Sequence, residues 1–241
     1  MVSIIIATYN SEKTLRRAMN SVLNQDYQDW ECIVVDGASK DGTIGIVKEF
    51  VAKDPRFRYI SEPDKGIYDA FNKGWKMAKG EWVMYLGSDD EYTKEGIKAL
   101  MENSDGADVV YGDVILRYLN GRVKVQKASK TDFYGTSAFC GHQAVAMKTD
   151  VVKDMKGFDM SYKLLSDWDL LRRSGQNGYV YKYVDASIAY FSVGGASSNN
   201  YFSTLEAYMI YRKSNNVFCS DITLLYRLIR KFLLIQKSKL C

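Results

Sequence analysis

Two adjacent aspartates are the residues of this chain best suited to chemistry. In the stretch GEWVMYLGSDDEY, residues 80–92, Asp89 and Asp90 follow directly on a predicted buried strand. Ligands of open α/β folds bind at the carboxyl ends of such strands, where two carboxylates can hold a divalent cation. The same residues can also cap the helix predicted to begin near Thr93. Their neighbours along the sheet therefore matter.

Other predicted strands deliver polar groups to the same edge. Residues 2–8 form an apolar strand that ends at Thr8, and residues 30–36 form another that ends at Asp36. Asp64 follows a further strand. Acidic residues can serve a nucleotide in two ways, by hydrogen bonds to base and ribose, or through a hard cation that neutralises a diphosphate. The pattern predicts a nucleotide site at this edge.

The elements that must position these residues fall into two halves. Up to about residue 90, short apolar strands alternate with amphipathic helices, which is typical of a parallel sheet with crossover helices. We predict strands at 2–8, 30–36, 56–61 and 81–87, and helices at 11–24, 41–52 and 66–78. Beyond residue 109 the pattern is mixed, with a hairpin at Asn120-Gly121, a strand at 143–148, a helix at 167–176 and a pair of short strands at 179–191. The chain is therefore predicted to be α/β, with a nucleotide-binding half at 1–108 and a mixed half at 109–200.

Size and missing motifs exclude several classes of protein. The 241 residues are 46% hydrophobic, enough for one large domain with a substantial core. The four cysteines show no C-x-x-C spacing, so neither a zinc site nor a disulfide framework is expected. The sequence has no Walker lysine loop, no G-x-G-x-x-G and no H-E-x-x-H, which argues against P-loop NTPases, dinucleotide oxidoreductases and zincins.

The positive charge is concentrated at the C-terminus. Residues 212–241 carry seven Lys or Arg and one acid, a net +6, whereas the whole chain has +4, so the remainder is at −2. This distribution argues against a nucleic-acid partner. We predict a helical extension over 201–241, in which 221–241 form a basic amphipathic helix. Such a helix can lie in an anionic membrane interface, or it can pack its apolar stripe on the domain.

The N-terminus bears on where the protein works. Met1 leads almost directly into the first predicted strand, and no apolar run approaches the length needed to span a bilayer. We therefore expect a cytoplasmic protein, peripheral on the inner face of the plasma membrane if its tail binds lipid.

Four motifs in a fixed order carry a resemblance to a known family. They are SIIIATYN, SVLNQDYQDWECIVVDGASKDGT, SEPDKGIYDAFNKGWKMAKGEWVMYLGSDDEY and SDWDLLRR. Across residues 2–175 the chain resembles the inverting GT-A glycosyltransferases of the large bacterial family 2. The resemblance implies a Rossmann-like, mainly parallel central sheet flanked by helices. It also implies transfer of a sugar, with inversion, from a nucleotide-diphosphate sugar, for which we expect UDP. The expected acceptor is a hydroxyl of a glycan or lipid-linked oligosaccharide in cell-surface polysaccharide biosynthesis.

The resemblance also assigns roles to the polar residues at the predicted sheet edge. Asp90 corresponds to the acid that coordinates Mg²⁺ or Mn²⁺, and Ser88 stands where many relatives have a third acid. Four residues correspond to donor-binding positions: Thr8, Asp36, Asp64 and Asp89.

The later motifs, in the half at 109–200, contain the residues that the resemblance places on the acceptor side. Asp167 matches the family's catalytic base near the start of a helix, where it can take the acceptor's proton. Because Ser166 replaces a common glutamate, Asp169 stays open as the alternative base. His142 and Gln143 lie in a segment similar to the acceptor-side strand, and Trp168 is expected to stack on an acceptor sugar. A lone histidine is also commonly structural.

Two other functions remain open from the sequence. A nucleotidyltransferase shares a nucleotide-binding sheet and acidic metal ligands, although ATYNSEKT is a poor phosphate loop. A non-catalytic nucleotide-sugar-binding assembly subunit could use the basic tail for docking. Only the enzymes would show turnover.

Overall fold

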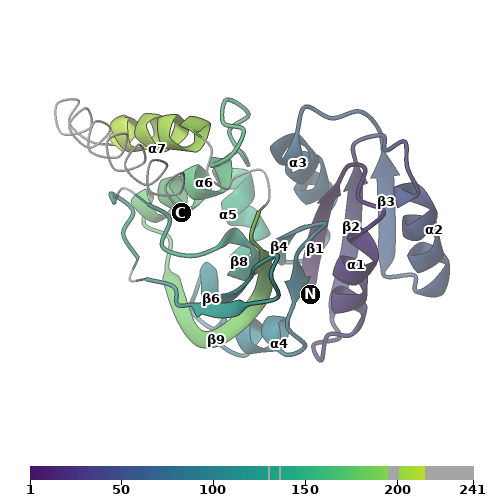
Figure 1. Cartoon of the computed structure of the whole chain (residues 1–241). Helices are drawn as coiled ribbons and strands as arrows, with labels where there is room; N and C mark the ends of the chain where they lie inside the picture. Colours follow the sequence, from purple (N-terminus) through teal and green to yellow (C-terminus); the bar gives the residue numbers. More distant parts are fainter. Residues whose placement is uncertain (130, 136, 195–200, 215–241) are drawn as a thin grey trace.

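The protein is built around one mixed sheet with helices on both faces (Figure 1). The computed structural model describes residues 1–129, 131–135, 137–194 and 201–214. The strand order is β3-β2-β1-β4-β8-β6-β9-β5, and β7 pairs with β6 outside this path. The N-terminal half contains β1 (Val2–Thr8), α1 (Leu15–Leu23), β2 (Trp30–Asp36), α2 (Thr43–Lys53), β3 (Phe57–Ser61), α3 (Ile67–Met77), β4 (Trp82–Gly87), β5 (Glu91–Tyr92) and α4 (Gly96–Met101). The rest contains β6 (Val109–Arg117), β7 (Val123–Gln126), a 3₁₀ turn η1 (His142–Ala144), β8 (Val145–Lys148), α5 (Thr149–Asp154), α6 (Ser166–Gln176), β9 (Tyr181–Ser192) and α7 (Tyr201–Ser214).

The parallel half of the sheet confirms the prediction from sequence. Strands β3, β2, β1 and β4 run parallel, and each begins and ends within one residue of its predicted bounds. All seven residues of β1 are buried, as expected for a parallel strand covered on both faces. Ile4 and Ile6 pack towards α1 and α2, whereas Ile5 packs towards α3. This double covering holds the carboxyl ends of β1, β2 and β4 at one edge.

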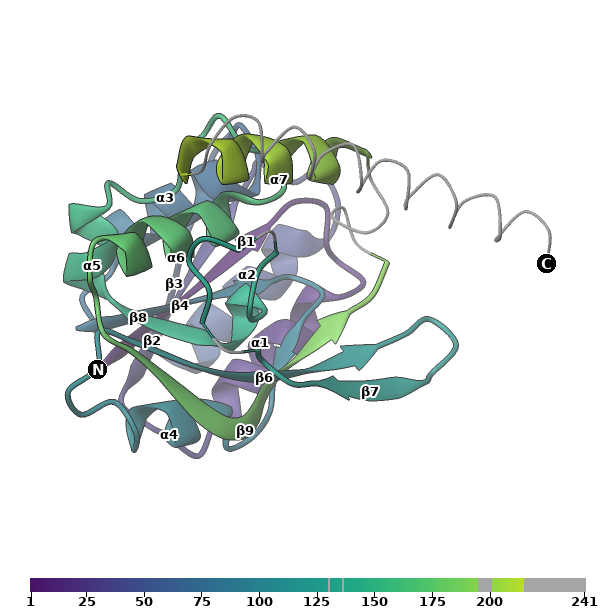
Figure 2. The ribbon, with the colours of Figure 1, turned by 90° about the vertical axis from the view of Figure 1, so that its left-hand side faces the viewer.

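The second half is mixed, and it contains one long strand where the sequence predicted two short ones. The hairpin at Asn120-Gly121 is confirmed, because β6 and β7 pair antiparallel around it (Figure 2). The prediction of two short strands at 179–191 is wrong, since β9 is one continuous strand parallel to β6. The pairing shifts register after Tyr111↔Tyr183, and the next pair is Asp113↔Ser187. A bulge thus absorbs residues that looked like a turn.

Helix α7 packs on the domain beside α6 (Figures 1 and 2). Ala207 and Ile210 of α7 are buried against Tyr162 and Trp168. The predicted helical start near residue 201 is confirmed, whereas the proposed membrane-binding segment 221–241 lies outside the described residues. Among the described residues, none of the helices has the length and apolar character required to cross a bilayer.

Candidate active site

A cleft of about 780 Å³ opens at the carboxyl edge of the parallel strands. Its walls come from segments far apart in the chain, namely the loops after β1 and β4, the turn η1, the start of α6 and the end of β9. Five of the predicted site residues line it: Asp89, Asp90, His142, Gln143 and Asp167. The fold therefore brings the acidic pair and the predicted base into one cavity.

Asp90 is the most enclosed acid of the cleft. The residue is 3% exposed, and its carboxylate accepts hydrogen bonds from Gln143 Nε2 at 2.7 Å and from the Ser192 backbone N–H at 2.9 Å. Burial, together with the negative charge of Asp89, raises the pKa of the Asp90 carboxyl. A positive charge placed beside Asp90 would relieve this cost.

Asp89 and Asp90 form a compact carboxylate pair above Gly87. A Cβ at Gly87 would lie 3.0 Å from both Asp89 Oδ1 and Asp90 Oδ2, so glycine leaves room for the two side chains. No group of three His, Cys, Asp or Glu side chains arranged to hold a metal occurs in the part of the chain that the structure describes. Two carboxylates suit Mg²⁺ or Mn²⁺ when phosphate oxygens and waters supply the other ligands. The residues present therefore fit a cation shared with a bound diphosphate.

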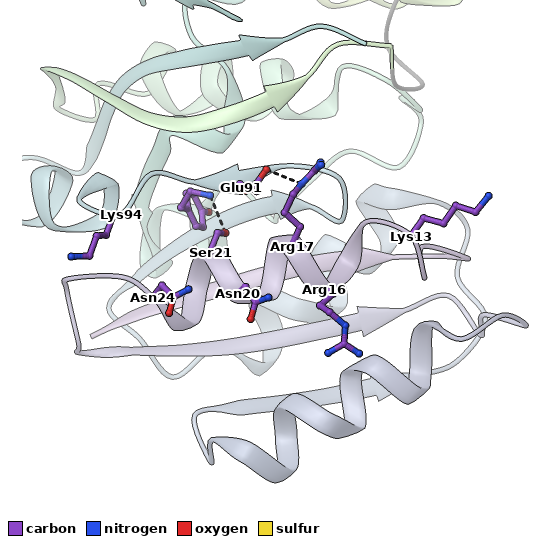
Figure 3. A pocket seen from close by; sticks show the side chains of 9 residues that line it. Lys13, Arg16, Arg17, Asn20, Ser21, Asn24, Glu91 and Lys94 are labelled. Carbon is purple, nitrogen blue, oxygen red and sulfur yellow. Dashed lines mark hydrogen bonds and ion pairs between the residues drawn. The ribbon is translucent and has the colours of Figure 1, made fainter. Parts of the chain in front are cut away.

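Arg17 fixes the backbone of this acidic loop, a role that the sequence did not reveal. Its guanidinium donates a hydrogen bond to the Asp89 carbonyl oxygen at 2.8 Å and pairs with Glu91 at 2.7 Å. The Ser192 hydroxyl donates to the same Asp89 carbonyl at 2.6 Å. Figure 3 shows Arg17 directed at Glu91, within a separate pocket of about 460 Å³ along α1. Neighbouring Arg16 instead pairs with Glu49 of α2.

Asp167 is held by two partners at the other side of the cleft. The Tyr68 hydroxyl donates a hydrogen bond to Asp167 Oδ1 at 3.0 Å, and His142 Nδ1 lies 3.0 Å from Asp167 Oδ2. The Asp167 side chain keeps 21% of its surface exposed. It stands in the first turn of α6, where the helix dipole favours a negative charge. Tyr68 belongs to the quoted motif containing GIYDAF, although its position gave no sign of this contact.

The contact between His142 and Asp167 shifts the pKa of both side chains. Burial raises the pKa of Asp167, but the hydrogen bond and charge of His142, together with hydrogen bonds from the Trp168 backbone N–H and the Tyr68 hydroxyl, outweigh burial and lower that pKa. Burial pulls the pKa of His142 down, yet the hydrogen bond and charge of Asp167 prevail and raise it. Asp167 is thus held as a carboxylate, the form that can accept a proton.

The alternative base, Asp169, faces away from the cleft. Its side chain is 3% exposed and accepts a hydrogen bond from Arg173 Nε at 2.7 Å. Asp169 does not contribute to the lining of the cleft, whereas Asp167 does. The geometry therefore favours Asp167 as the proton acceptor.

Two predicted acceptor contacts require correction. Trp168 is only 2% exposed and packs with Tyr162 beneath α7, so it does not present a face to a sugar. Gln143 is also 2% exposed, and its amide is occupied by Asp90. The first turn of α6 directs Trp168 inward while Asp167 faces the cleft, and Gln143 orients Asp90.

The predicted donor residues other than Asp89 do not line the cleft. Asp36 is fully buried and accepts hydrogen bonds from Ser39 and Ser61, so it shapes the loop after β2 and has no surface to offer a nucleoside. Thr8 is 4% exposed, and its hydroxyl has no partner among the described residues. Asp64 lies in the loop between β3 and α3 and approaches Gly37, the residue after β2, so closely that a Cβ at Gly37 would meet Asp64 Oδ2 at 2.6 Å.

The sheet, the acidic cleft edge and the helix-borne carboxylate define the GT-A class of glycosyltransferase fold. Two solved structures share the fold. S. aureus TarS, residues 1–349, in complex with UDP-GlcNAc has a TM-score of 0.71 at 23% identity, covering 95% of this chain and 72% of that one. The mannosyltransferase PcManGT from Pyrobaculum calidifontis, in complex with GDP-Man and Mn²⁺, has a TM-score of 0.70 at 16% identity, covering 92% and 69%.

Sequence comparison identifies the family. The family model described as Glycosyl transferase family 2 matches residues 3–158. A PGL/p-HBAD biosynthesis glycosyltransferase of Mycobacterium tuberculosis is 32% identical over 205 residues, which cover 83% of this chain and 79% of the relative. A putative teichuronic acid biosynthesis glycosyltransferase, TuaG of Bacillus subtilis, is 34% identical over 103 residues, covering 42% and 41%. This chain belongs to glycosyl transferase family 2, and it is a glycosyltransferase rather than a nucleotidyltransferase.

Proposed function

We propose that this glycosyltransferase moves a sugar from a nucleotide-diphosphate sugar, with UDP as the expected nucleotide, to an acceptor hydroxyl with inversion. The observation that carries the proposal is the presence, in one cleft, of the Asp89–Asp90 pair and the Asp167 carboxylate. The Asp89–Asp90 pair can bind the cation of a diphosphate, and the Asp167 carboxylate can accept the proton of a hydroxyl nucleophile. The complexes of TarS with UDP-GlcNAc and of PcManGT with GDP-Man and Mn²⁺ support a nucleotide-sugar donor.

Asp167 serves as the general base in this proposal. The acceptor oxygen forms a bond to the anomeric carbon while its proton passes to Asp167, and the bond from that carbon to the diphosphate oxygen breaks. A single displacement of this kind inverts the anomeric configuration. Tyr68 and His142 keep the carboxylate oriented, since each bonds one of its oxygens. Catalysis by a held base depends on such orientation.

Asp89 and Asp90 would hold the divalent cation, Mn²⁺ or Mg²⁺. When bound, such a cation supplies positive charge against the negative charge that develops on the departing diphosphate. Gln143 and the Ser192 backbone N–H orient Asp90 for this role, and Arg17 fixes the carbonyl of Asp89. Thr8 and Asp64 remain proposed donor contacts near the end of the parallel strands.

The proposed acceptor is a glycan or lipid-linked oligosaccharide used in cell-surface polysaccharide biosynthesis. The names of the mycobacterial and Bacillus relatives support this class. His142 is the proposed acceptor contact, because it lines the cleft and its side chain is 23% exposed. We further propose that the enzyme acts at the inner face of the plasma membrane, where residues 221–241 meet anionic lipid. Co-sedimentation with anionic vesicles should then fail after deletion of 221–241.

Calorimetry tests the donor site. UDP, GDP, CDP and dTDP are titrated with and without Mn²⁺ into the natural chain and into Asp90→Ala. Metal-dependent binding of one diphosphate, weakened by Asp90→Ala, is expected. Failure of all four to bind at saturating Mn²⁺ would contradict the transferase proposal and favour the non-catalytic assembly subunit.

Turnover tests the base. Asp167→Asn is expected to abolish release of UDP from UDP-sugars while leaving the Kd for UDP unchanged. Asp105→Asn, an exposed aspartate away from the cleft, is the matched control. Equal turnover in the two variants would exclude Asp167 as the base.

A further inference from the structure

Three consecutive backbone N–H groups point at one carboxylate from another helix. Glu206 of α7 accepts hydrogen bonds from Lys163 at 2.7 Å through Oε1, and from Leu164 at 2.9 Å and Leu165 at 3.0 Å through Oε2. These three residues line the cleft, and α6 begins immediately after them at Ser166. Glu206 therefore holds the segment that leads directly into Asp167.

The local sequence offers this segment no substitute for Glu206. Leu165 is the N-cap of α6 and has no polar side chain, and the helix start has no side-chain cap hydrogen bond. A carboxylate near a helix N-terminus is favoured by the helix dipole as well as by the N–H groups that it binds. Hydrogen bonds to a charged acceptor are roughly twice as strong as neutral ones. Removing Glu206 would leave three N–H groups to be satisfied by water.

Helix α7 is itself anchored by residues that follow Glu206 in the helix. Ala207 and Ile210 are 5% and 1% exposed, and they pack with Trp168. Lys213, one turn further, pairs with Asp159 at 3.1 Å. The carboxylate is thus carried by a helix that is fixed against the domain.

We propose that Glu206 is a positioning residue, which sets the 163–165 segment and through it the place of Asp167 in the cleft. This inference rests on the proposed role of Asp167 as the base. It makes α7 a part of the catalytic unit, although α7 lies beyond the residues matched by the family model. The hydrogen bonds of Glu206 in the described part of the chain go to residues 163–165 and not to Asp89 or Asp90, so we expect donor binding to change little without Glu206.

Two variants and two controls separate an effect of Glu206 on the position of Asp167 from a general effect on the stability of the protein. Glu206→Ala removes the acceptor, and Glu206→Gln keeps one oxygen. Met209→Ala truncates an exposed side chain on the same helix, and Ile210→Ala loosens the packing of α7 without touching the hydrogen bonds. Each protein is assayed for UDP release from UDP-GlcNAc, UDP-glucose and UDP-galactose with water as acceptor, for the Kd of UDP, and for hydrogen exchange at residues 163–165.

Glu206→Ala should lower kcat by about tenfold or more, because a small misplacement of a catalytic group is costly. The Kd of UDP should stay within about twofold of the wild-type value, and the backbone amides of residues 163–165 should exchange faster. Glu206→Gln should recover part of kcat and part of the protection of these amides from exchange. Met209→Ala should match the natural chain. If Glu206→Ala does not fold, the kcat, the Kd of UDP and the hydrogen exchange of Glu206→Gln test the inference instead.

Unchanged kcat and unchanged exchange in Glu206→Ala would overturn the inference. So would an equal loss of kcat in Ile210→Ala with normal exchange at 163–165, since that would reveal a general effect of stability. If the wild-type protein neither binds UDP nor releases it, the UDP-sugar donor of the proposed function fails, whereas hydrogen exchange still reports whether Glu206 holds residues 163–165.

Discussion

Tyr68 and Asp167 lie 99 positions apart in the chain and are joined by a hydrogen bond of 3.0 Å. Tyr68 stands on α3, which packs against the parallel half of the sheet, and Asp167 lies in the first turn of α6 in the mixed half. The Tyr68 ring stacks on Phe158, with centroids 5.4 Å apart. This contact couples the predicted base to the packed core between the two halves.

Replacing Tyr68 by Phe should weaken catalysis with little change of fold. The stacking on Phe158 remains, but Asp167 loses a hydrogen bond of the charged type, which contributes about 1.5–3 kcal/mol. We expect a lower kcat and a lower free energy of unfolding, measured by UDP release and urea titration. Tyr134→Phe, at an exposed tyrosine, is the control. Equal kcat in Tyr68→Phe and the natural chain would argue that this bond does not orient the base.

His142→Ala should shift the acid limb of the pH–rate profile to higher pH. Burial raises the pKa of Asp167, and the hydrogen bond and charge of His142 are the largest of the contributions that together lower it. Without His142, burial dominates, the pKa of Asp167 rises, and the base is protonated at a higher pH. Besides Asp167, the acids near His142 are Asp89 and Asp90.

The measurement is kcat for UDP release between about pH 4 and pH 8, with saturating UDP-sugar. Tyr68→Phe should shift the limb in the same direction but less, because its hydrogen bond is the smaller contribution to the pKa of Asp167. An unshifted limb in His142→Ala would contradict the coupling of the two side chains.

Asp159 should make the stability of the protein depend on acid pH. Burial raises its pKa, but hydrogen bonds from Ser161 and Lys213 outweigh burial and lower the pKa to about 2. A carboxyl whose folded pKa is depressed stabilises the fold above its unfolded pKa of about 3.9, and this stabilisation is lost as the pH falls towards 2. The deficit in unfolding free energy of Asp159→Asn should therefore be largest at pH 7 and shrink between pH 4 and pH 2. A deficit that stays constant with pH would contradict this assignment.

Two glycines in helices should respond to alanine with opposite signs. A Cβ at Gly74 in α3 would overlap the side chain of Ile5 in β1, so Gly74→Ala should destabilise the protein by about 1–3 kcal/mol. A Cβ at Gly45 in α2 meets no atom within 4 Å, so Gly45→Ala should stabilise it by up to about 1 kcal/mol. Urea unfolding measures both. A Gly74→Ala variant as stable as the wild type would contradict the close packing of α3 on β1, and a destabilised Gly45→Ala would contradict the open space at Gly45.

The sequence determined the parts of the molecule that depend on local pattern. Uninterrupted apolar runs predicted β1, β2 and β4, because a strand covered on both faces has few polar positions. The chain then turns at the strand ends, so Asp89 and Asp90 had to lie at the carboxyl edge whatever surrounded them. The position of Asp167 in the family motif was likewise apparent from the order of the motifs.

Tertiary structure alone decided the partners of these residues. Gln143 and Trp168 lie in segments that looked acceptor-facing, yet Gln143 bonds Asp90 and Trp168 is covered by α7. The direction of a side chain depends on which distant segment packs against it, and a buried carboxylate such as Asp90 requires donors wherever the fold can bring them. Glu206 shows the same limit, because only the docking of α7 on α6 turns an ordinary helical glutamate into the acceptor for three N–H groups beside the base.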